Sequence, residues 1–110
     1  MILGGVVIKF KKIQFIEQDE KFTFDDRIVV IERDENQNPL FAHFRCPCGC
    51  GKEIILPLYE TSKPYWDVFI KKRNVSFYPS IYLSNSECQS HFWIIKNKVL
   101  WSEDLYEDYY

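Results

Sequence analysis

Four cysteines and one histidine carry the clearest chemical signal in this sequence. Three cysteines stand at alternate positions, Cys46, Cys48 and Cys50, while Cys88 lies close before His91. Thiolates and imidazole nitrogens are preferred ligands of zinc, which usually takes four of them in a tetrahedron. We therefore expect one Zn²⁺ ion bound by Cys88, His91 and two of the three loop cysteines. The sequence does not choose among the three.

The residues around the thiols support a metal site but leave alternatives open. Gly49 and Gly51 permit the positive φ angles that a tight loop needs. Neighbouring cysteines this close pair badly as disulfides, and in a reducing compartment such a group indicates metal binding or catalysis. Zinc loops usually space their cysteines differently, so buried free thiols and an iron–sulfur cluster are the competing interpretations.

Acid–base candidates lie beside the same loop. Glu53 follows it at once and could act as a general base or orient a metal ligand, or it could be a solvated strand-end carboxylate. His43 lies shortly before the loop on a predicted strand and could move a proton or be structural. Ser80 could lie near the cysteines, but the sequence identifies no base for it. Ser90 stands between two expected ligands.

Length and charge bound the remaining possibilities. The chain has 110 residues, a net charge of -2 and 46% hydrophobic residues, which predicts one zinc-binding domain over residues 1–101 and a loose acidic, tyrosine-rich tail over 102–110. Near-neutral charge argues against nucleic-acid binding, and no apolar run has the length of a membrane span. The opening residues lack the basic start of a signal peptide, so we expect a cytoplasmic protein.

Short strands dominate the expected secondary structure. Alternating or β-branched segments bounded by turn residues predict strands at 13–16, 27–32, 40–44, 53–58, 67–70, 75–78, 91–95 and 99–101. With no long helical period, the expected fold is mostly β, a small single-domain sandwich or rolled antiparallel sheet stapled by one zinc site.

The order of these motifs resembles a known family. The pattern consists of the cysteine loop 46–51, Glu53, Trp66, Pro79-Ser80-Ile81 and the Cys88-to-Trp93 segment. It is similar to a small bacterial zinc-binding family of unknown function that is encoded beside ubiquitin-like conjugation genes. The resemblance covers roughly residues 10–101. It implies partnership with a ubiquitin-like protein and with E1-like or E2-like proteins.

Two functions follow as expectations. The first is a zinc-dependent peptidase that processes or deconjugates a bacterial ubiquitin-like protein, with three protein ligands, an activated water, and Glu53 or His43 as the proton-handling group. The second is a non-catalytic adaptor in which four protein ligands close round the zinc and only stabilise the fold. The number of protein ligands distinguishes the two.

Overall fold

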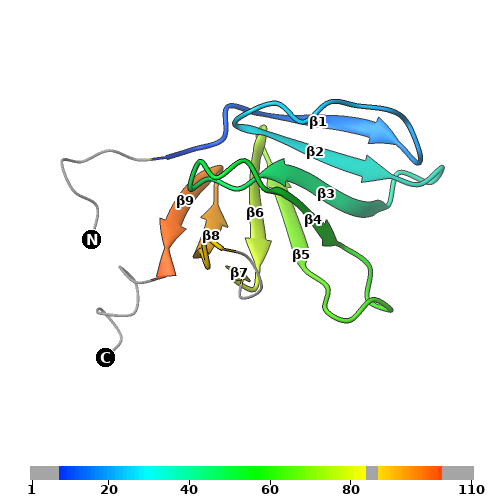
Figure 1. Ribbon diagram of the computed structural model, residues 1–110. Coiled ribbons are helices and arrows are strands. Elements are labelled where there is room, and N and C mark those ends of the chain that lie inside the picture. The colour runs from blue at the N-terminus through cyan, green and yellow to red at the C-terminus, as the bar shows by residue number, and fades with distance from the viewer. Residues whose placement is uncertain (1–7, 84–86, 103–110) are drawn as a thin grey trace.

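The computed structural model describes residues 8–83 and 87–102. The secondary-structure elements in these residues are nine β-strands (Figure 1). The strands are β1 (Lys12–Glu17), β2 (Ile28–Arg33), β3 (Pro39–Arg45), β4 (Glu53–Pro57), β5 (Asp67–Lys71), β6 (Asn74–Tyr78), β7 (Ile81–Tyr82), β8 (His91–Ile95) and β9 (Lys98–Trp101). The mostly-β prediction is confirmed.

The strands form three small sheets ordered β1-β2-β3-β4, β5-β6 and β7-β8-β9. All pairings are antiparallel except that β1 runs parallel to β2, a departure from the expected antiparallel sheet. A parallel pair needs a long connection, and residues 18–27 provide it.

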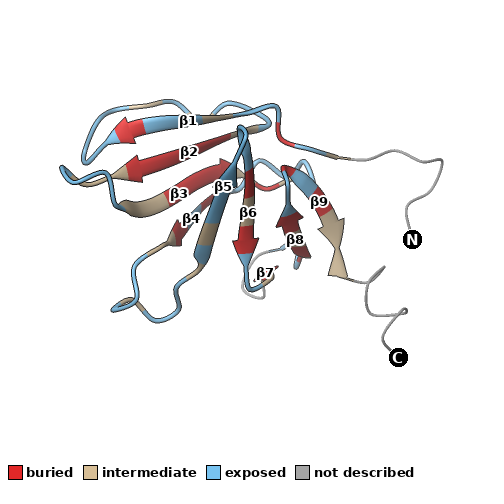
Figure 2. Ribbon diagram, turned by 180° about the vertical axis from the view of Figure 1, so that it is seen from behind, coloured by how far each residue is buried: buried red, intermediate tan, exposed pale blue. Residues whose placement is uncertain are grey.

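One hydrophobic core lies between the sheets, and alternation along the strands explains it. In β6, Val75 and Phe77 are buried between more exposed neighbours, and in β8 the same holds for Phe92 and Ile94. Figure 2 shows red, buried segments on β6 and β8 and on β2 and β3, and buried residues from all four strands form one core cluster. The thiol-bearing Cys46 belongs to this core, so the cysteine loop starts from a fixed point.

The strand β2 is buried along most of its length because both of its faces are covered. Val29 and Ile31 face the core, whereas Val30 and Glu32 face the opposite side with His43 of β3. The connection after β1 covers that side, where Phe22 packs against the His43 ring at 4.6 Å.

The eight predicted strands agree with the observed ones to within a residue or two, and β7 was not expected. The predicted tail at 102–110 lies outside the described residues except for Ser102. Within the described chain, no helix is long and apolar enough to cross a membrane.

Candidate active site and metal centre

The loop between β3 and β4 turns three thiols toward one point. The backbone N–H of Cys46 donates to the carbonyl of Lys52 at 2.8 Å, which closes the loop, and Gly49 N–H donates back to the Cys46 carbonyl. Gly49 and Gly51 have φ angles of 93° and 84°, which residues with a Cβ rarely adopt. The glycines therefore let the chain reverse twice within a few residues.

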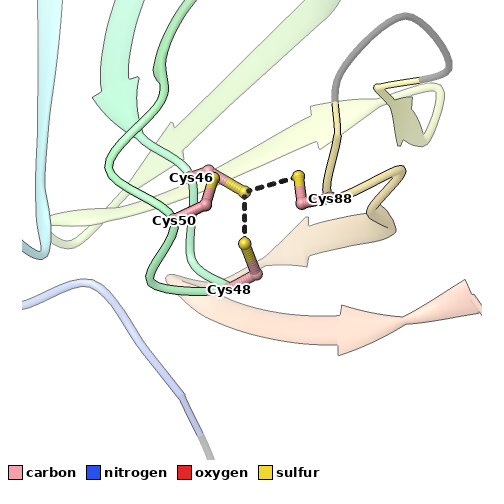
Figure 3. Close-up of side chains that lie close together, drawn as sticks. All are labelled: Cys46, Cys48, Cys50 and Cys88. Carbon is pink, nitrogen blue, oxygen red and sulfur yellow. Dashed lines mark hydrogen bonds between the residues drawn. The ribbon is translucent and has the colours of Figure 1, made fainter.

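The fourth thiol comes from the segment before β8. The Leu83 N–H donates to the Ser90 carbonyl at 2.8 Å and brings Cys88 beside the loop. The Sγ atoms of Cys46, Cys48, Cys50 and Cys88 all lie within 4.8 Å of one another (Figure 3). Four sulfurs at the zinc–sulfur bond length of a tetrahedral site would be about 3.8 Å apart. The four thiols therefore form a site that could hold a metal ion.

The environment of the sulfurs also suits a cation. Burial raises the pKa of the Cys46 thiol to about 12, since a bare thiolate in the core would be poorly solvated. A bound metal ion reverses this preference by pairing with the negative sulfur. The Ser90 hydroxyl donates to Cys88 Sγ at 3.4 Å and lies 3.9 Å from Cys46 Sγ, where it helps to orient both ligands.

His91 stands outside this group of four thiols. Its Nε2 lies 2.8 Å from the Oγ of Ser80. His91 is the first residue of β8 and pairs with Tyr82 of β7, whose ring lies 4.9 Å from the imidazole. The structure thus places an imidazole nitrogen beside Ser80, a neighbour that the sequence did not identify.

Ser80 is held by its own backbone as well. It lies between β6 and β7, and its carbonyl accepts a hydrogen bond from the indole N–H of Trp66 at 3.2 Å. Ser80 and His91 are both half-buried, so their side chains are positioned but remain partly open to solvent. A serine hydroxyl bonded to an imidazole nitrogen is the arrangement of an activated nucleophile and its general base.

The other two acid–base candidates lie elsewhere. His43 is buried, with Nε2 2.9 Å from Oε1 of Glu32, and Oε2 of Glu32 accepts from the Asp19 N–H at 3.1 Å. Glu53 is exposed at the start of β4, opposite Arg45. In the described structure, neither side chain lies in the candidate metal site formed by the four cysteines.

The Ser80–His91 pair depends on the register of β7 against β8. Tyr82 lies opposite His91, and Ser80, two residues before Tyr82, reaches the His91 imidazole diagonally across the strands. The nearness of Cys88 to His91 in the chain instead favoured a shared metal. Strand pairing, which acts over a longer range, brought the histidine to the serine.

One of three comparisons with known proteins gave a match. No curated protein and no solved structure is significantly similar to the chain. A family model described as "Bacterial ubiquitination-like system serine protease (BubE)" matches residues 16–102, a range that includes the four cysteines, Ser80 and His91. On that match, which spans most of its length, the chain belongs to the BubE family of bacterial ubiquitination-like system serine proteases.

Proposed function

We propose that this protein is a serine protease that cleaves a ubiquitin-like protein from an extension or a conjugate, with Ser80 as nucleophile and His91 as general base. The observation that carries the proposal is the 2.8 Å separation of Ser80 Oγ and His91 Nε2 in a half-buried, partly open position. The family description supports a protease role in a ubiquitination-like system. An E1-like or E2-like protein is a further expected partner.

Each residue of the proposed mechanism has a defined part. Ser80 Oγ attacks the scissile carbonyl while its proton passes to Nε2 of His91. The imidazolium then gives that proton to the departing amine, which leaves an ester on Ser80. Water hydrolyses the ester in the second half, with Nε2 taking a proton from the water and returning it to Oγ. The Tyr82 ring lies against the His91 imidazole, and the Trp66 N–H holds the backbone carbonyl of Ser80.

We propose that the four thiols bind a structural Zn²⁺ ion. Thiolates alone form a donor set typical of structural zinc sites, and four of them leave no place for a water molecule. The ion would join the loop after β3 to the segment before β8 and so support the strand that begins at His91. Its chemistry would be limited to holding the thiolates together.

A metal-dependent peptidase is the competing proposal. In that mechanism the cysteines would hold an ion whose chemistry would be to activate water, and Glu53 or His43 would transfer the proton. The observation behind it is the group of four thiols formed by Cys46, Cys48, Cys50 and Cys88; His91, the fifth ligand expected from the sequence, contacts Ser80 instead. The serine mechanism passes through an ester on Ser80, whereas the metal-dependent mechanism forms no covalent bond to a side chain.

The deciding experiment is labelling of the full chain with a fluorophosphonate, followed by mass spectrometry of its peptides. We expect the label on Ser80, no label after Ser80→Ala, and loss of cleavage of a ubiquitin-like precursor in the same variant. Ser62→Ala is the matched control, because Ser62 donates only to a nearby backbone carbonyl in a loop. Cleavage that survives Ser80→Ala but disappears with Glu53→Ala would establish the metal-dependent mechanism instead. Precursor binding without cleavage or labelling would favour the adaptor.

A further inference from the structure

We propose that the face carrying the Ser80–His91 pair continues into a basic cleft that binds acidic side chains of the cleaved polypeptide. This inference rests on the proposed function, since it assigns a specificity site to the same protease. The cleft has a volume of about 400 Å³ and is lined by Phe69, Lys71, Lys72, Asn74, Ser76 and Lys96.

Two hairpin turns build the cleft, and a buried side chain joins them. Lys72 and Arg73 form the turn between β5 and β6, and Lys96 and Asn97 form the turn between β8 and β9, all with positive φ. The Asn97 Oδ1 accepts from Val75 N–H at 2.7 Å, and its Nδ2 donates to the Arg73 carbonyl at 3.3 Å. The lysines are therefore displayed from a fixed framework.

The positive charges in the cleft have no carboxylate partner in the part of the chain that the structure describes. Three of its six lining residues are lysines and none is acidic. Among the residues that the structure describes, Lys71, Lys72 and Lys96 form no ion pair with a carboxylate. A concave site with unpaired cations attracts anionic groups, and the attraction is stronger where walls exclude water.

The cleft and the Ser80–His91 pair lie on one continuous surface, which we call the outer face. It consists of the residues on β5 to β8 that point away from the core: Phe69, Ser76, Tyr78, Tyr82, His91 and Trp93. β6 and β8 run in opposite directions side by side (Figure 1). Consequently the end of β6 near Ser80 meets the start of β8 at His91, and the opposite ends of both strands meet at the lysines.

Aromatic side chains fill the space between the two ends. The Tyr78 and Trp93 rings lie 5.9 Å apart, and Tyr78 and Phe69 are both well exposed. Beyond them, the Ser76 hydroxyl accepts from the Lys96 N–H at 2.8 Å. Exposed rings that continue into unpaired cations suit a peptide with apolar residues followed by acidic ones.

The length of β8 sets the spacing that such a peptide needs. His91 and Lys96 are joined by one extended strand, which at about 3.3 Å per residue corresponds to roughly 17 Å. An extended substrate would therefore place its acidic side chains about five residues from the cleaved bond. Because the bond cleaved by a serine protease is an amide, the molecule that spans both ends is a polypeptide.

The test measures binding to full-length Ser80→Ala protein, which holds the probe without cleaving it. The probes are a fluorescent peptide of about five leucines followed by about five glutamates, the same peptide with glutamine for glutamate, and an oligothymidylate of similar length. We expect the glutamate peptide to bind at least about tenfold more tightly than the glutamine peptide, and the difference to shrink as salt screens the charges.

Two charge-matched variants locate the site. Lys71→Glu, Lys72→Glu and Lys96→Glu together should remove the preference for glutamate. Lys11→Glu, Lys12→Glu and Lys21→Glu together change the net charge equally, use exposed lysines outside the cleft, and should change the affinity less than about twofold. Thermal melting confirms that each variant is folded.

Several results would overturn this inference. Equal affinity for the two peptides would show that the cleft does not recognise acidic side chains. An equal loss of affinity in both triple variants would show the same. Tighter binding of the oligothymidylate would make the cleft a nucleic-acid site. Glutamate-peptide binding that emerges only after Glu103, Asp104, Glu107 and Asp108 are neutralised would assign the cleft to the chain's own C-terminal residues. Failure of Ser80 to react with a fluorophosphonate is a separate result that contradicts the proposed function.

Discussion

The indole N–H of Trp66 donates to the backbone carbonyl of Ser80 across 3.2 Å. This bond ties the loop before β5 to the residue whose side chain faces His91. It fixes the serine backbone without touching Oγ, so Trp66 acts as a positioning residue in the proposed mechanism.

Trp66→Phe should keep the aromatic packing of this position and lose only the hydrogen bond. We expect kcat to fall by about tenfold with little change in KM, because a misplaced nucleophile affects the chemical step. The free energy of unfolding should fall by about 1 kcal/mol. Trp101→Phe, in a ring that packs on Phe92, is the matched control, and an equal loss of kcat in it would refute a specific role for Trp66.

Ser80 and His91 should behave as one catalytic unit. Each single variant, Ser80→Ala and His91→Gln, should lower kcat/KM by about 10³-fold or more, and the double variant should be no worse than the more impaired single one. The measurement is steady-state cleavage of one precursor by all four proteins. If the fold-loss of kcat/KM in the double variant equals the product of the two single losses, the two side chains act independently.

Removal of the metal should unfold or strongly destabilise the protein. We expect about one zinc per chain by elemental analysis of reduced protein, and a chelator should lower the melting temperature sharply because metal binding and folding are coupled. Cys46→Ser should lose both metal and stability. Ser90→Ala should retain the metal with an affinity weakened by about tenfold, since it removes only a contact to the ligating sulfurs.

One result would contradict a structural metal ion. If reduced protein contains no metal and melts at the same temperature with and without a chelator, the four thiols do not form a metal site.

The Glu32–His43 pair should contribute to stability and not to turnover. Glu32→Ala leaves a buried imidazole without its hydrogen-bond partner, so we expect a loss of about 1–3 kcal/mol in the free energy of unfolding, by denaturant titration. Glu32→Leu combined with His43→Phe replaces the pair by apolar groups and should recover much of that stability. If this double variant folds but no longer cleaves the precursor, His43 takes part in catalysis.

Local features of the sequence determined most of the fold. Alternation at positions such as 54–56 and 92–94 is set by the two-residue period of a strand, and Gly49 and Gly51 are set by the φ angles of a tight loop. Such properties depend on neighbouring residues alone. The types and spacing of the cysteines predicted a shared metal site, but that prediction counted His91 among the ligands and left one loop cysteine out, whereas the structure groups all four thiols.

Only the tertiary structure decided which side chain the histidine contacts. Cys88 precedes β8, whereas the His91 side chain points from the first residue of β8 to the outer face, and pairing with β7 brings Ser80 there from another part of the chain. Proximity along the chain therefore suggested a metal ligand, and strand pairing produced a Ser80–His91 contact of 2.8 Å instead. The parallel β1–β2 pair was hidden for the same reason, because strand direction depends on distant residues and not on local pattern.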